Sequence, residues 1–151
     1  MSERDYLKID SPRDALAVLS LKVYKKFGIS ALPLIKEVCS ELGQTIGAKM
    51  KKTLSDHSLG AVGQAFVDSA HSRGSKVAIV EKSGEVFHLK TGKGYRCAMG
   101  LNNTDRQICE AMMAMDLGIF EAATGESLKM EILQSLAGND SCCEIIYRLK
   151  K

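Results

Sequence analysis

A change of hydrophobic period near Lys76 divides the sequence into a helical part and a part rich in strands. Before Lys76, apolar residues recur at spacings of three and four, which is typical of amphipathic helices. After it, short runs of β-branched and aromatic residues are separated by turn residues, which indicates hairpins. Helices grouped ahead of hairpins predict an α+β fold, in which the helices cover one face of an antiparallel sheet.

Three helices are predicted within residues 11–74. The first begins at Ser11-Pro12, because serine caps a helix N-terminus and proline fits its first turn, and it stops at Gly28. The third runs from about Leu59 to Ser72. The second carries an apolar stripe that consists of Leu34, Ile35, Val38, Leu42, Ile46 and Met50.

Gly43 and Gly47 lie four residues apart inside the second helix. Two glycines at this spacing allow another backbone to approach closely. We interpret them as a packing face within the chain. A homodimer that uses the same face is the alternative.

Residues 76–150 are predicted to form two hairpins separated by one long helix. The hairpins turn at Ser83-Gly84 and at Gly138-Asn139-Asp140. The helix begins at about Thr104, which has the spacing of a capping box with Gln107, and it ends at Gly125. We expect residues 1–151 to form a single domain.

Charge and hydropathy limit the classes of function. The net charge is +3, and the basic residues form small clusters with acids among them and without a recognisable nucleic-acid-reading motif. We therefore expect no direct nucleic-acid binding. No apolar run approaches the roughly 18 residues of a membrane span and no secretion signal is apparent, so we expect a cytoplasmic protein. Its five cysteines are then expected as thiols or ligands rather than a disulfide framework.

A ligand pocket is predicted beside the long helix, which carries three methionines within four positions. Methionine repacks easily around apolar molecules, and a chain with 5% aromatic residues and no tryptophan leaves room in its interior. A small apolar or aromatic molecule is the expected ligand, although such a stripe is also compatible with an ordinary core. The predicted lining residues are Phe66, Met112, Met113 and Phe120.

Four of the five cysteines lie within the last 55 residues of the chain. Cys97 falls in a predicted loop, Cys109 on the long helix, and Cys142 and Cys143 at the final hairpin. Strand parity with Ile145 directs Cys143 toward the core and Cys142 to the other side. Thiolates suit zinc or an iron-sulfur cluster, but no C-x-x-C spacing is present and buried cysteines also serve as small apolar residues. Both interpretations remain open.

The segments Tyr95-Arg96-Cys97-Ala98-Met99-Gly100 and Gly138-Asn139-Asp140-Ser141-Cys142-Cys143-Glu144-Ile145, with Cys109 between them, give a family resemblance. Residues 20–150 resemble the vinyl-4-reductase-type domain, also called the hydrocarbon-binding domain. That family is associated with tetrapyrrole reduction, with sensing of aromatic compounds and, through its fold, with trafficking-complex subunits.

The resemblance implies a homodimeric small-molecule-binding or sensing domain. It also implies that Cys97, Cys109 and Cys143 form a cluster that holds zinc or an iron-containing centre, or that responds to redox state. Aromatic-sensing members usually have a further cysteine eight positions before the last one. Here that position is Ser135, which limits the ligand set to three thiols.

The Cys142-Cys143-Glu144-Ile145 ending also resembles that of the aminothiazoline-carboxylate hydrolases. This second resemblance implies an enzyme that acts on a small carboxylate or heterocycle. Cys143 or Cys97 would be its nucleophile, with His88 as a possible partner, or the cysteines would surround a hydrolytic metal. The sequence favours a binding domain over this enzyme without excluding either.

Overall fold

The computed structural model describes residues 8–92, 94 and 96–151. Lys93 and Tyr95, which belong to predicted loops, and the N-terminal residues 1–7 lie outside this part. The described α-helices are α1 (Pro12–Phe27), α2 (Leu32–Thr53), α3 (Leu59–Ser72), α4 (Arg106–Met112) and α5 (Ala114–Thr124). The strands are β1 (Val77–Lys82), β2 (Val86–Thr91), β3 (Leu128–Gln134) and β4 (Glu144–Leu149).

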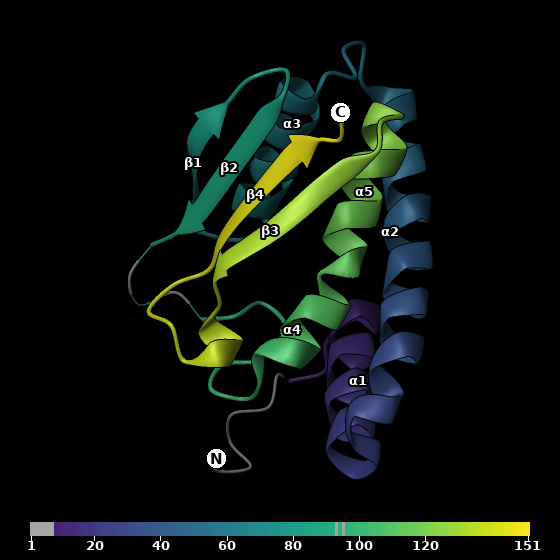
Figure 1. The fold of residues 1–151 in the computed structure, drawn as a ribbon, viewed down its shortest axis with the longest axis vertical. Helices are drawn as coiled ribbons and strands as arrows, with labels where there is room; N and C mark the ends of the chain where they lie inside the picture. Colours follow the sequence, from purple (N-terminus) through teal and green to yellow (C-terminus); the bar gives the residue numbers. More distant parts are fainter. Residues whose placement is uncertain (1–7, 93, 95) are drawn as a thin grey trace.

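The strands form one antiparallel sheet in the order β1-β2-β4-β3. Each predicted hairpin is present, and the two hairpins join where β2 pairs with β4, with Leu89 opposite Ile145. α3 and α5 pack against the sheet, and α2 lies alongside α5 on the side away from β1 (Figure 1). The predicted α+β class, with helices packed on an antiparallel sheet, is therefore confirmed.

The helix starts predicted from serine caps are confirmed. The Ser11 hydroxyl accepts a hydrogen bond from the Asp14 N–H at 3.1 Å, and the Ser58 hydroxyl accepts one from the Ala61 N–H at 3.3 Å. These oxygens satisfy backbone donors that a helix cannot satisfy internally. Gly125 ends α5 with a φ of 74°, a left-handed conformation that favours glycine.

The long helix predicted from Thr104 to Gly125 is instead two segments, α4 and α5, which meet at Met113. Asp105 caps α4 by accepting from the Gln107 N–H at 2.7 Å, whereas the Thr104 hydroxyl donates to the Leu101 carbonyl. Both segments contact α2, but α4 also packs against the β3–β4 connection, whereas α5 runs along α2 and reaches α3 and β3. Such tertiary contacts leave no local signal in the sequence.

The buried face of α2 is rotated from the predicted stripe. Its buried residues are Ile35, Cys39, Gly43 and Gly47, while Leu34 and Val38 remain 66% and 53% exposed. A Cβ on Gly43 would overlap the Met115 carbonyl oxygen, and one on Gly47 would overlap the Ile119 carbonyl oxygen. The glycine face is therefore filled by α5 of the same chain, as the packing interpretation predicted.

A homodimer on the Gly43/Gly47 face is consequently wrong, because the backbone of α5 occupies that face. Homodimerisation through another surface stays a prediction.

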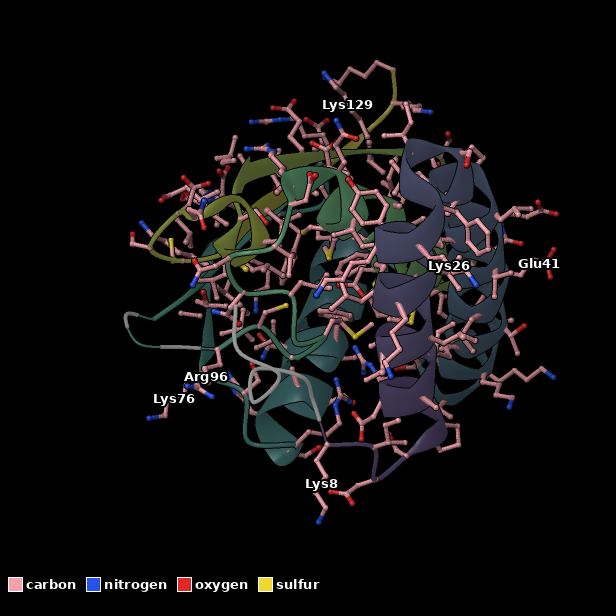
Figure 2. The ribbon with its side chains drawn as sticks, turned by 90° about the horizontal axis from the view of Figure 1, so that it is seen from below. Lys8, Lys26, Glu41, Lys76, Arg96 and Lys129 are labelled. Atoms are coloured by element: carbon pink, nitrogen blue, oxygen red, sulfur yellow. The ribbon has the colours of Figure 1, made fainter. Side chains whose placement is uncertain are left out.

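Charged side chains surround the molecule rather than gather on one face. Lys8, Lys26, Glu41, Lys76 and Lys129 project from different sides, and the yellow sulfur atoms lie mainly inside (Figure 2). Among the described helices, none is both long enough and apolar enough to span a bilayer.

Candidate ligand-binding cavity

A cavity of about 510 Å³ lies between the sheet and helices α3, α4 and α5. Leu89 of β2, Ile132 of β3 and Ile145 of β4 supply its sheet side. Met112, Met113 and Met115 supply much of its helix side. Residues of the loop before α4, including Cys97 and Met99, line a further part of the wall. The wall is mainly apolar, so its surface favours molecules that gain free energy by leaving water.

Three of the four predicted lining residues reach this cavity. Phe66, Met112 and Met113 lie on its wall, together with Met99 and Met115. Phe120 does not line the cavity: it is fully buried, and its ring stacks on Tyr147 with centroids 4.1 Å apart. Phe120 contributes to the core behind the pocket, where it also contacts Phe66 at a centroid distance of 5.0 Å.

The three cysteines of the predicted cluster share the cavity wall. Cys97 comes from the loop, Cys109 from α4, and Cys143 from the residue before β4. Burial, with smaller contributions from the neighbouring thiols of Cys97 and Cys109, raises the pKa of Cys143 to about 11. Cys142 does not line the cavity but is the more buried of the two, at 4% exposure, and both cysteines precede β4, so the strand parity used for the prediction does not apply to them.

The arrangement of these thiols can be compared with the needs of a metal centre. Metal binding requires deprotonated thiols, whereas burial raises the pKa of Cys109 and Cys143. Within residues 8–92, 94 and 96–151, no group of three or more Cys, His, Asp or Glu side chains is placed to hold a metal ion. The three thiols as placed do not form a ready ligand set, and the zinc or iron centre stays a prediction.

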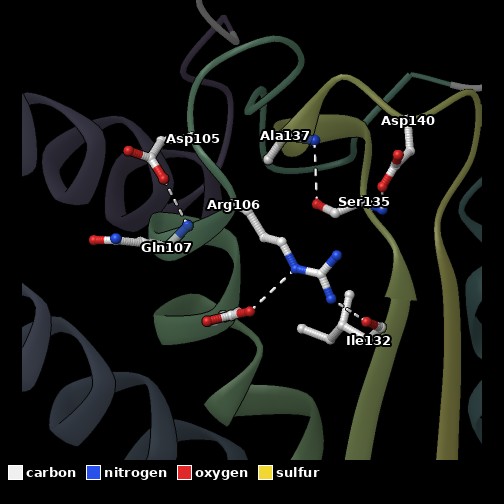
Figure 3. A network of polar contacts seen from close by, with 8 residues as sticks. Asp105, Arg106, Gln107, Ile132, Ser135, Ala137 and Asp140 are labelled. Carbon is white, nitrogen blue, oxygen red and sulfur yellow. Dashed lines mark hydrogen bonds and ion pairs between the residues drawn. The ribbon is translucent and has the colours of Figure 1, made fainter.

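A polar network lies between the start of α4, the end of β3 and the β3–β4 connection (Figure 3). Arg106 of α4 donates to the Ile132 carbonyl of β3 and to Glu110, the latter at 3.1 Å. The Ser135 N–H donates to Asp140 at 2.9 Å, and the Ser135 hydroxyl accepts from the Ala137 N–H at 3.2 Å. These bonds hold the β3–β4 connection against the start of α4.

Ser135 occupies the position where aromatic-sensing members of the resembled family have a further cysteine. It is fully buried, and its hydroxyl hydrogen-bonds the Cys109 thiol, which partly offsets the rise that burial causes in the Cys109 pKa.

A Cys–His pair is not formed by His88. In β2, Phe87 and Leu89 face the helices, so His88 lies on the opposite face of the sheet. There its Nε2 lies 3.4 Å from the Glu144 carboxylate, whereas Cys143 faces the cavity. The hydrolase interpretation that uses His88 as the base for Cys143 is wrong for this reason.

Asp116 and two arginines were missed by the sequence analysis. Asp116 of α5 lies on the cavity wall, as do Arg13 of α1 and Arg73 after α3. Burial raises the pKa of Asp116 to about 6, against the opposing effect of the two guanidinium groups. The sequence feature that could have indicated Asp116 is that it is the single acid in the otherwise uncharged run Ala111–Phe120.

Comparison with known proteins gives matches only at the level of structure. No model of a known family matches the chain, and no curated protein does. The phenol-responsive sensory domain of the transcription activator PoxR, solved with phenol, superimposes with a TM-score of 0.63 at 17% identity, over 94% of this chain and 76% of that chain.

A second solved structure is the trafficking protein particle complex subunit 3 from Naegleria fowleri, covalently bound to palmitic acid. It superimposes with a TM-score of 0.56 at 13% identity, over 92% of this chain and 93% of that chain. The chain thus has the α+β fold shared by a sensory domain and a trafficking subunit. The fold implied by the sequence resemblance is confirmed, and membership of the hydrocarbon-binding family stays a prediction.

Proposed function

We propose that this chain is a domain that binds or senses a small, largely apolar molecule. The observation that carries the proposal is the partly open cavity of about 510 Å³ between sheet and helices, whose wall is mainly methionine, leucine and isoleucine side chains with a few polar ones. Its volume falls in the range of about 300–1,000 Å³ that is usual for small-molecule sites. A single aromatic ring with a short substituent would fit inside it.

The comparisons support the proposal through the kind of ligand that this fold accommodates. One neighbour is described as phenol-responsive and the other as covalently bound to palmitic acid. Both molecules are largely apolar, which agrees with the wall of the present cavity. The methionines add adaptability, because their unbranched side chains repack around ligands of different shape.

The test uses protein labelled with ¹³C at the methionine methyl groups. Met99, Met112, Met113 and Met115 line the cavity, whereas Met50 and Met130 do not. Titration with toluene is expected to shift the four cavity signals and to leave Met50 and Met130 nearly unchanged. A Met113→Trp variant, which fills the cavity, is expected to lose the response. Equal shifts at all methionines, or none, would refute a specific apolar site.

A metal- or redox-dependent role for Cys97, Cys109 and Cys143 is part of the same proposal. Its support is their common position on the cavity wall, where the thiols affect one another's pKa. Elemental analysis of anaerobically purified protein tests the metal, with one equivalent of zinc or iron expected for a filled centre. Less than about a tenth of an equivalent, together with full stability of a triple Cys→Ser variant, would end the metal hypothesis, because structural metals contribute directly to folding.

A further inference from the structure

Asp116 is a carboxyl group in an otherwise mainly apolar part of the molecule. It lies on α5 and lines the cavity, as does its neighbour Met115. Among the described residues, no hydrogen bond or ion pair reaches its carboxylate. Asp116 is half-buried, and a carboxylate partly removed from water without such a partner costs folding free energy, so its position in a ligand cavity requires an explanation.

The other ionisable groups that act on Asp116 come from each element packed around it. The guanidinium groups of Arg13 and Arg73 lower its pKa through their charge, but both side chains are exposed at the molecular surface. Burial raises the pKa of Cys39 on α2, of Cys109 on α4 and of Tyr147 on β4, and the Asp116 carboxylate makes a smaller contribution in the same direction. The neighbouring thiols and the phenol are neutral in this environment, and within the part of the chain that the structure describes the cations acting on Asp116 are the two exposed arginines.

The free carboxylate is an acceptor for a ligand. Because it lies on the wall of the cavity, a molecule that fills the cavity comes within reach of its oxygens. An ionised carboxylate forms its strongest hydrogen bonds with charged donors, and a low dielectric environment strengthens them further. The cavity thus combines an apolar wall with one anionic acceptor.

We infer that the cavity selects apolar molecules that carry a protonated amine, with the ammonium group bound to the Asp116 carboxylate. This inference rests on the proposed function and specifies its ligand class. A hydroxyl group gives only a neutral donor, and a ligand carboxylate meets repulsion from Asp116. Arg13 and Arg73 oppose a cation at longer range, but solvent and salt screen exposed charges while the contact inside the cavity stays short.

The experiment compares four benzene derivatives of nearly equal size: toluene, benzyl alcohol, benzylamine and benzoate. Binding is measured by calorimetry at pH 7.5 for the wild-type chain, for Asp116→Asn and for Asp68→Asn. Asp68 is exposed on α3, outside the cavity, and provides the same chemical change as a control. Wild type is expected to bind benzylamine most tightly, then benzyl alcohol, then toluene, with benzoate weakest.

The Asp116→Asn substitution is expected to weaken benzylamine binding by about 10- to 100-fold, as the loss of a charge-assisted hydrogen bond predicts, and to leave toluene binding unchanged. Asp68→Asn should change neither. In wild type, benzylamine affinity should also fall as the pH drops below about 6, where Asp116 becomes protonated.

The possible failures are distinguishable. Toluene binding without a preference for benzylamine, or a benzylamine preference that survives in Asp116→Asn, would overturn the amine inference and leave the apolar site intact. Tightest binding of benzoate would also overturn it, in favour of the arginines. Binding of none of the four molecules would overturn both the inference and the proposed function. If Asp116→Asn fails to fold, the pH dependence of wild-type binding decides.

Discussion

Thr91 and Cys143 join β2 to the residue before β4 by reciprocal hydrogen bonds. The Thr91 N–H donates to the Cys143 carbonyl at 2.9 Å, and the Cys143 N–H donates to the Thr91 hydroxyl, also at 2.9 Å. Both residues lie on the cavity wall. The pair therefore holds the Cys143 thiol at a fixed place in the pocket, although β4 itself begins only at Glu144.

Replacement of Thr91 by valine should destabilise the fold. Valine preserves the shape of the side chain but removes the hydroxyl, which leaves the Cys143 N–H without its acceptor in a poorly solvated place. An unsatisfied buried donor costs about 1–3 kcal/mol. Urea denaturation would measure the loss, with Thr91→Ser, which keeps the hydroxyl, as the control. Equal stability of the valine and wild-type proteins would show that water replaces the hydroxyl.

Gly43→Ala should also destabilise the protein, although alanine is the better helix former. Helix propensity favours alanine by about 1 kcal/mol in a helix interior. The new Cβ would overlap the Met115 carbonyl oxygen, however, and overpacking of this kind costs about 1–3 kcal/mol or more because a backbone atom cannot turn aside. The expected net effect is a lower melting temperature.

Gly84→Ala is the matched control for that substitution, because no atom lies within 4 Å of a Cβ built there. Its melting temperature should change little. A Gly43→Ala protein that is more stable than wild type would show that α2 and α5 separate easily.

The periodicity and turn residues contained the information for most of the fold. Serine caps, glycine stops and the two hairpin turns are local signals, and each acts through backbone geometry that does not depend on distant contacts. The rotation of α2 was not predictable in the same way. The apolar side chains of Leu34 and Val38 predicted a buried position, but both are exposed. The face of α2 that carries Gly43 and Gly47 is buried instead, because α5 packs closely against those two glycines.

The cavity was partly predictable for a similar reason. Met112 and Met113 were recognisable from their density on one helix, and Cys143 from its position beside a strand. Asp116 was missed because an acid in a helix is usually placed at the surface, and only the assembled fold shows that this one is half-buried on a cavity wall. Arg13 and Arg73 come from segments 60 residues apart, which no spacing pattern connects.

Asp116→Asn should make the fold more stable at neutral pH. The pKa of Asp116 is raised from 3.8 to about 6, so the folded state holds this proton more tightly than the unfolded state does. The stability contributed by the protonated carboxyl is present below about pH 3.8 and is lost as the pH rises through about 6. Asparagine removes this loss, which amounts to at most about 3 kcal/mol above pH 7.

The measurement is urea denaturation of both proteins from pH 4 to pH 8. Their free energies of unfolding should be similar near pH 4 and should diverge in favour of Asp116→Asn as the pH rises. A constant difference across this range would show that Asp116 ionises normally. Comparing the two proteins cancels the titration of Asp56, whose lowered pKa is common to both.

The Cys143 thiol should react slowly with iodoacetamide in the native protein. Burial raises its pKa from 9.0 to about 11, which reduces the thiolate fraction near neutral pH by about 100-fold, and only the thiolate attacks the reagent. Mass spectrometry of alkylated peptides gives the rate at each cysteine separately, and the same protein unfolded in guanidinium supplies the control. Alkylation at pH 8 should therefore be at least about 100-fold slower in the native state. Rapid modification of Cys143 below pH 8 would instead reveal an activated nucleophile, which is what the hydrolase interpretation requires and a binding domain does not.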